Sequence, residues 1–281
     1  MQWDSERPYI RISLCSDRLA EHSLEDVVGI AADLGYEGIE IMASAGHMPE
    51  DASDESIERI AQQLANYGME CVALWPPAGR FAQKSDADAE ADIEHIQRYM
   101  QIAERLQCRI LGLQIGGPPN PREAREDHWL RAAHYLRECC DLALGKRLDV
   151  VVDNSPGLTA TIDDTLYLLS LVDRPNLGVN YGPADLLQTD RFYGLQALAR
   201  FGDLVFNIHL RDGVQGRVDD ASAPLLGEGE LEYHGIAGWL KESGYVGFVS
   251  AACRRTATLE YSSVDIARHE YAAIRQLLEE S

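Results

Sequence analysis

The residue best placed for acid–base chemistry in this chain is His209, near the end of the apolar run 204–210. This run is too short for a buried helix and is rich in branched and aromatic residues, so it predicts a buried β-strand. An imidazole titrates near neutral pH, and it can therefore carry protons or bind a metal ion. A buried histidine can equally be structural and need only a hydrogen-bond partner, so both interpretations stay open.

Three carboxylates lie at or just beyond the ends of other predicted strands. Glu40 lies in the run 38–41, Asp153 closes 148–153, and Asp185 follows 177–181. Polar groups at the carboxyl ends of parallel strands gather into one site in α/β barrels, so we expect these groups near His209. Glu40 could accept a substrate hydroxyl, or act as a base whose pKa burial raises. Alternatively, it is a structural partner of an arginine or a backbone amide.

Four further side chains are candidates for substrate binding. Trp75 precedes Pro76-Pro77 and could stack on a sugar face or simply pack at the rim. Gln114 could bind a hydroxyl or cap the backbone. Arg211 could clamp a ligand or form an internal ion pair. Arg254 could bind a phosphate or carboxylate group, or it could be a surface arginine that starts the last loop.

The elements that must position these residues alternate regularly along the chain. Helical segments with apolar faces separate the predicted strands, and Ser23 and Gly35 are typical start and stop signals of the first helix. Parallel strands with helical crossovers form an open sheet or a closed barrel. Eight strands alternating with eight helices in 281 residues favour one (β/α)8 TIM barrel over residues 1–281. The predicted strands are 10–15, 38–41, 69–74, 109–115, 148–153, 177–181, 204–210 and 247–252.

Composition narrows the classes of partner. The net charge of −21 repels phosphate backbones and anionic membranes, which argues against a nucleic-acid or membrane partner. We find neither a signal peptide nor an apolar stretch long enough to cross a bilayer, and the six cysteines show no metal or disulfide spacing, so we expect a cytoplasmic protein. The chain has neither a Walker loop nor a G-x-G-x-x-G motif after its first strand, so we expect no nucleotide cofactor.

Four motifs resemble the sugar phosphate isomerase/epimerase family, the group of xylose-isomerase-like barrels. They are Gly35-Tyr-Glu-Gly-Ile-Glu-Ile41, His209-Leu-Arg-Asp212, Leu226-Gly-Glu-Gly-Glu230 and Gly244-Tyr-Val-Gly-Phe-Val-Ser250. The resemblance implies a barrel whose site lies at the carboxyl end of the strands. It also implies a small sugar, polyol or inositol derivative as substrate, a divalent Mn, Zn or Mg ion held by four side chains, and a possible homo-oligomer.

The metal positions implied by the resemblance are altered in this chain. Asp153 stands where the family has a glutamate, on a stem one methylene shorter, and His209 is kept. Gly182 and Ala252 stand where the family has an aspartate and a glutamate, and Asp185 replaces the usual histidine. The motifs therefore predict a degenerate metal site. Asp185 could join Asp153 and His209 in a replacement set, but tight binding is not expected.

The resemblance implies a proton-transfer isomerase, epimerase or related lyase, with Asp153, His209 and Glu40 as the catalytic groups. Two-base epimerisation needs a carboxylate on each face of the substrate, and Ala252 cannot supply the second one. The alternative is a barrel that has lost catalysis and serves as a binding or partner subunit. Gly182 and Ala252 are the main support for that alternative.

Overall fold

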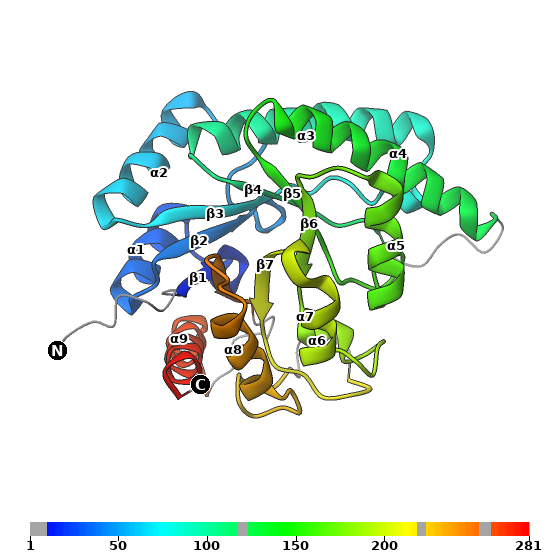
Figure 1. The fold of residues 1–281 in the computed structure, drawn as a ribbon. Helices are drawn as coiled ribbons and strands as arrows, with labels where there is room; N and C mark the ends of the chain where they lie inside the picture. Colours follow the sequence, from blue (N-terminus) through cyan, green and yellow to red (C-terminus); the bar gives the residue numbers. More distant parts are fainter. Residues whose placement is uncertain (1–9, 117–122, 218–222, 253–259, 281) are drawn as a thin grey trace.

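Eight parallel strands form a closed barrel in a computed structural model of the chain (Figure 1). The structure describes residues 10–116, 123–217, 223–252 and 260–280. Each strand pairs with the next along the chain, and the last pairs with the first, which confirms the predicted barrel. The strands are β1 (Arg11–Cys15), β2 (Gly38–Met42), β3 (Glu70–Trp75), β4 (Ile110–Leu113), β5 (Asp149–Asp153), β6 (Leu177–Tyr181), β7 (Val205–Leu210) and β8 (Phe248–Ala251).

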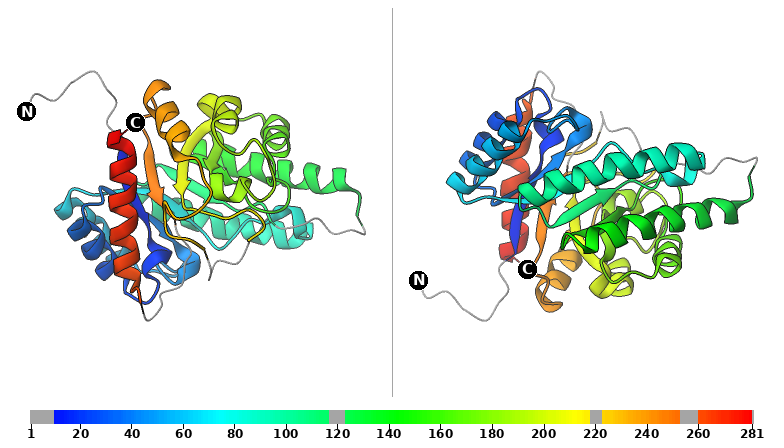
Figure 2. Two further views of the ribbon diagram at one scale, coloured as in Figure 1. Left: turned by 90° about the horizontal axis from the view of Figure 1, so that it is seen from below. Right: turned by 90° about the horizontal axis from the view of Figure 1, so that it is seen from above.

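Helices cover the outside of the barrel, as the views from below and above show (Figure 2). Among the described residues there are nine α-helices instead of the eight expected, because the short α6 begins at Pro183 directly after β6. The helices are α1 (Leu24–Leu34), α2 (Asp54–Tyr67), α3 (Asp86–Arg105), α4 (Arg125–Leu144), α5 (Ile162–Val172), α6 (Pro183–Leu186), α7 (Leu195–Phe201), α8 (Tyr233–Glu242) and α9 (Ser263–Glu280). Single 3-10 turns lie at Ser16–Leu19, Ala43–Ala45, Phe81–Gln83 and Gly202–Leu204.

Local sequence signals account for the ends of these helices. The Ser23 hydroxyl accepts the backbone N–H of Asp26 at 3.1 Å and caps the start of α1. Gly35 ends α1 with φ of 97°, a left-handed conformation that costs glycine little. The predicted start and stop of the first helix are therefore confirmed.

Apolar side chains separate into a large outer core and a small cluster inside the barrel. The outer core lies between the strands and the helices. The inner cluster consists of Ala73, Trp75 and Val151, with Met42, Ile110 and Phe206 packed against it. Because side chains alternate along a strand, Glu40 points inward with Met42, and Asp153 points inward with Val151.

In the described part of the chain, no helix is long and apolar enough to cross a bilayer. Five cysteines in that part are free and buried: Cys15, Cys71, Cys108, Cys139 and Cys140. The sixth, Cys253, lies outside the described residues.

Candidate active site

The centre of the candidate site is a hydrogen-bonded pair formed by Glu40 of β2 and His209 of β7. Nε2 of His209 donates to Oε2 of Glu40 at 2.8 Å. The Glu40 side chain is fully buried, whereas that of His209 is 16% exposed, so the histidine is the member of the pair that a ligand can reach. The structure therefore joins two residues that are far apart in the sequence, as the strand-end argument predicted.

Glu40 accepts four hydrogen bonds, two at each carboxylate oxygen. Its Oε1 accepts Nδ2 of Asn207 at 2.7 Å and the hydroxyl of Ser250. Its Oε2 accepts Nε1 of Trp75 at 2.6 Å in addition to the bond from His209. A carboxylate offers about four lone-pair sites, so the acceptor capacity of Glu40 is fully used. These bonds fix the carboxylate and, through it, the orientation of the His209 ring.

The protonation of Glu40 differs from the expectation of a base with a raised pKa. Burial raises the pKa of this carboxyl group, but the charge of His209 and the hydrogen bonds from His209, Ser250 and Asn207 outweigh burial, and the pKa is lowered. The expected direction was wrong, because the sequence does not show how many donors converge on the carboxylate. Glu40 is thus an ionised partner that orients His209.

Trp75 lies inside the barrel beside this pair. Its indole ring is 5.3 Å from the His209 ring, between centroids, and only 4% of the residue is exposed. A Cβ on Gly112 would lie 2.3–2.4 Å from three atoms of the indole. Trp75 can therefore enter the barrel only because β4 carries no side chain at this position. Trp75 serves as a hydrogen-bond donor to Glu40 and as a wall of the site, a role that neither sequence interpretation included.

A belt of buried polar side chains continues from Glu40 around the barrel. The hydroxyls of Ser13 and Ser250 lie 2.6 Å apart, and Ser250 donates to Glu40. On the other side, Nδ2 of Asn207 bridges Glu40 and Oδ1 of Asn180, the latter at 3.0 Å. Sequence analysis missed these residues. The available signal was a polar residue inside an otherwise apolar strand, which needs a partner when buried.

The space beside Gly182, where the resemblance implies an aspartate, is occupied by a neighbouring carboxylate. A Cβ on Gly182 would lie 3.0 Å from Oδ2 of Asp185, so this carboxylate fills the space beside the glycine. The other oxygen, Oδ1, accepts Nη2 of Arg211 in an ion pair. Arg211 lies two residues beyond His209 and, by strand alternation, on the same face. The pair places a fixed guanidinium, whose charge Asp185 balances, at the mouth of the barrel.

The remaining predicted residues are distributed around the same end. Asp153, at the end of β5, accepts a hydrogen bond from Ser155 at 3.0 Å. Oε1 of Gln114 accepts Nη2 of Arg80 at 3.1 Å. Ala252, directly after β8, is 9% exposed. Arg254 lies outside the described residues. Of the four carboxylate and histidine candidates, Glu40 and His209 thus contact each other, and Asp185 contacts Arg211. Asp153 accepts the hydroxyl of Ser155 within its own loop.

Arg211 forms an internal ion pair, one of its two interpretations, with Asp185, whereas the adjacent Asp212 is bound by backbone groups. Its carboxylate is 1% exposed and accepts the backbone N–H groups of Gly227 and Gly229, both at 2.9 Å, and of Leu231 at 3.3 Å. A Cβ on Gly229 would lie 2.1 Å from Oδ1 of Asp212, so the close approach requires glycine. Asp212 therefore ties the Leu-Gly-Glu-Gly loop to the end of β7, next to His209.

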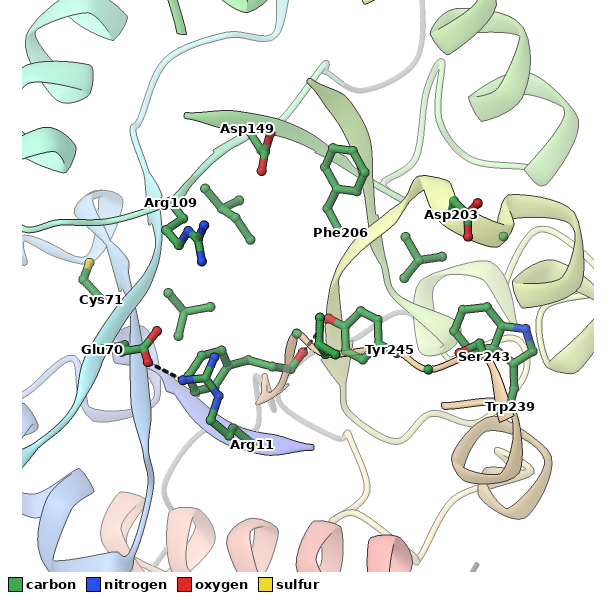
Figure 3. A pocket seen from close by; sticks show the side chains of 18 residues that line it. Arg11, Glu70, Cys71, Arg109, Asp149, Asp203, Phe206, Trp239, Ser243 and Tyr245 are labelled. Carbon is green, nitrogen blue, oxygen red and sulfur yellow. Dashed lines mark hydrogen bonds and ion pairs between the residues drawn. The ribbon is translucent and has the colours of Figure 1, made fainter. Parts of the chain in front are cut away.

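A cavity of about 630 Å³ opens at the carboxyl ends of β2, β3 and β4. Its lining includes Trp75, Arg80, Lys84 and Gln114, so Trp75 connects it to the Glu40–His209 pair. A second cavity of about 390 Å³ lies at the opposite, amino end (Figure 3). There Arg11 pairs with Glu70 and lies 4.1 Å from the centroid of the Phe248 ring. Barrel enzymes place catalysis at the carboxyl end, so the first cavity belongs to the site.

Metal ligands at this end fit the family pattern poorly. Gly182 and Ala252 offer no ligand atom, and the guanidinium of Arg211 holds the carboxylate that stands beside Gly182. One other set exists among the described residues: ligand atoms of Cys15, Glu40 and His209 lie within 4.8 Å of one another. Since both oxygens of Glu40 already accept two donors, an ion could enter this set only by replacing at least one of these hydrogen bonds.

A closed barrel of eight parallel strands with helices between them defines a protein of the TIM-barrel class. Residues 28–277 match the family model described as "Xylose isomerase-like TIM barrel". The chain belongs to this family. Among curated proteins, it is similar to a 3-dehydroshikimate dehydratase of Bacillus anthracis, with 26% identity over 177 residues. That match spans 61% of each chain.

Solved structures show the same fold at lower identity. A probable 3-DHS dehydratase, AsbF of Bacillus anthracis, has a TM-score of 0.79 and 18% identity, covering 95% of this chain and 99% of that one. The IOLI protein with a bound zinc atom has a TM-score of 0.84 and 16% identity, covering 96% and 99%. An L-ribulose 3-epimerase has a TM-score of 0.80 and 17% identity, covering 97% and 95%. Solved structures with this fold thus include an L-ribulose 3-epimerase and a probable 3-DHS dehydratase.

Proposed function

We propose that this protein is a proton-transfer isomerase or lyase acting on a small polyhydroxylated carbonyl compound, such as a sugar, polyol or inositol derivative. The observation that carries the proposal is the Glu40–His209 pair, a fixed carboxylate that orients a partly accessible imidazole. With Nε2 donating to Glu40, a neutral ring carries its lone pair on Nδ1. That nitrogen can accept a proton from the carbon next to a substrate carbonyl.

The chemistry assigned to this pair needs one base. His209 takes the proton from carbon, and the ionised carboxylate of Glu40 stabilises the resulting imidazolium. His209 then returns the proton to a neighbouring carbon or oxygen, which gives isomerisation, or to a leaving hydroxyl, which gives water and an unsaturated product. Epimerisation needs a second acid on the opposite face, and Ala252 has no such group. Dehydration or single-base isomerisation therefore suits the site better.

Other residues would hold the substrate for this reaction. Asp153 points into the barrel and is the second candidate base. Arg211, fixed by Asp185, would offer guanidinium N–H donors to an enolate oxygen on which negative charge develops. The family's metal would supply Lewis-acid stabilisation of the same oxygen. Because two of its ligand positions are empty of donor atoms here, no step of the proposal depends on the metal.

The test is proton exchange and turnover with a defined panel of substrates. Ketoses, inososes and 3-dehydroshikimate are incubated in deuterated water, with and without Mn²⁺, and followed by NMR. We expect deuterium incorporation or water loss for at least one compound, abolished in His209→Ala. His95→Ala is the matched control, because His95 is an exposed histidine paired with Glu50. It should behave like the wild type.

A specific feature favours the alternative of a binding barrel without catalysis. The Asp185–Arg211 ion pair closes the position of a lost metal ligand with a stable internal contact. Absence of exchange and turnover across the whole panel, together with calorimetric binding of one of its members, would replace the catalytic proposal with this one.

A further inference from the structure

Sequence analysis singled out none of the basic groups in the carboxyl-end cavity. Two cationic side chains, Arg80 and Lys84, line this space of about 630 Å³, and Asp17 is the single acidic residue among the lining residues that the structure describes. The chain as a whole carries a net charge of −21. The lining of this cavity has more positive than negative side chains, whereas the chain as a whole has many more negative ones. This difference in charge balance needs a specific cause.

The two cations differ in how their charges are balanced. Lys84 forms an ion pair with the carboxylate of Asp92, whose side chain is 10% exposed. Arg80 instead donates to the neutral amide oxygen of Gln114 at 3.1 Å, and it forms no ion pair with any residue in the described ranges. The positive charge on Arg80 is thus uncompensated at the edge of the cavity.

The backbone presents Arg80 in a fixed and uncommon conformation. Arg80 has φ of 55°, in the left-handed region that non-glycine residues rarely adopt. Its backbone N–H donates to the carbonyl oxygen of Gln114 at 2.6 Å, and the preceding Gly79 N–H donates to Oδ2 of Asp92 at 2.7 Å. These bonds attach the turn to β4 and α3. The arginine is held over the cavity by two neighbouring elements.

We infer that Arg80, with the amide of Gln114, forms a subsite for an anionic group of the substrate, either a carboxylate or a phosphate monoester. A guanidinium offers paired donors that match both groups, and an uncompensated charge in a concave space is the feature such a group would bind. Trp75 connects this subsite to the Glu40–His209 pair. The inference rests on the proposed function, because it assigns this cavity to the substrate.

The test compares an anionic with a neutral probe by calorimetry. 3-Dehydroshikimate carries a carboxylate, L-ribulose is uncharged, and inorganic phosphate represents the phosphate group. We expect the wild type to bind one of the two anions at least about tenfold more tightly than L-ribulose, an effect that weakens with added KCl. Which of the two anions binds decides between a sugar acid and a sugar phosphate.

The variant Arg80→Asn removes the charge while keeping a residue type that tolerates positive φ. We expect about ten- to hundredfold weaker anion binding in Arg80→Asn, with L-ribulose unaffected, and partial recovery in Arg80→Lys. Arg200→Asn is the control, since Arg200 is a surface arginine paired with Asp163. Equal anion binding by Arg80→Asn and the wild type, or no anion binding by the wild type, would overturn the inference.

The same measurements separate this inference from the proposed function. Anion binding that depends on Arg80 without turnover of any panel compound would refute the catalytic proposal and keep the subsite. Turnover with no preference for an anionic compound and no effect of Arg80→Asn would refute the subsite and keep the catalytic proposal.

Discussion

Replacing Glu40 with glutamine should destabilise the barrel, because a carboxamide cannot accept all the hydrogen bonds that the carboxylate accepts. Glu40 receives two donors at each oxygen. A glutamine can accept two donors at its single oxygen and presents an NH2 group to the others. The best orientation keeps the bonds from Trp75 and His209 and turns the NH2 group toward Asn207 and Ser250.

The cost of this orientation follows from the same contacts. The Ser250 hydroxyl can rotate and accept, since the direction of its bond with Ser13 is free. Asn207 must turn its amide, which ends its bond to Asn180 but gives its buried and unsatisfied Oδ1 a partner. The neutral hydrogen bond between Asn207 and Asn180 is lost. The hydrogen bonds from Trp75 and His209 then go to a neutral amide oxygen instead of a charged carboxylate. We expect a loss of about 2–4 kcal/mol in the free energy of unfolding.

Urea denaturation measures this loss as a lower midpoint with an unchanged slope. The control is Glu50→Gln, because the Glu50 side chain is 41% exposed and pairs with an exposed histidine. Its effect should be below about 1 kcal/mol. If both variants shift the midpoint equally, the buried carboxylate does not organise the site, and its role in orienting His209 is wrong.

Four further predictions concern acid denaturation, packing inside the barrel and metal binding. Because the pKa of Glu40 is lowered from 4.5, its contribution to stability is present above that pH and lost as pH falls through the folded-state pKa; acid denaturation of Glu40→Gln should therefore depend less steeply on pH than that of the wild type. Gly112→Ala should displace the Trp75 indole, shift its fluorescence and cost about 1–3 kcal/mol, and an unchanged emission spectrum would contradict the packing. Elemental analysis of protein purified without chelator should find metal well below one ion per chain. Ala252→Glu should raise the affinity for Mn²⁺ in calorimetry. Near-stoichiometric zinc that is lost in His209→Ala would instead place the ion at Cys15, Glu40 and His209.

The barrel could be predicted from the sequence because its signals are local and repeated. Apolar runs, the capping Ser23 and the terminal Gly35 each specify one element, and the regular alternation of strands and helices leaves few topologies. The shortest α-helix was missed because it lacks such a repeated signal. The helix Pro183–Leu186 is a single turn and has too few residues to show a periodic pattern.

The pair of Glu40 and His209 could be expected only in outline, because the sequence shows only that both residues lie on strands whose carboxyl ends meet at one end of the barrel. Which donors surround Glu40 depends on the register between strands that are distant in sequence, and sequence alone does not supply that register. The interpretation of Glu40 as a base with a raised pKa was therefore wrong, because the pKa of this carboxyl group is lowered. Arg80 was missed because its relevance depends on a turn held by Gln114, and no motif marks it.

The donors to Glu40 have a consequence for the order in which the chain can fold. Trp75 comes from β3, His209 and Asn207 come from β7, and Ser250 comes from β8, the last strand to be synthesised. A half-barrel made from the first four strands would contain this carboxylate with only the Trp75 donor available. Burying an ionised carboxylate with so few partners is costly, so such an intermediate must leave Glu40 hydrated. Dehydration of the barrel interior therefore has to coincide with the arrival of the carboxyl-terminal strands, which makes closure of the barrel and assembly of the site a single event.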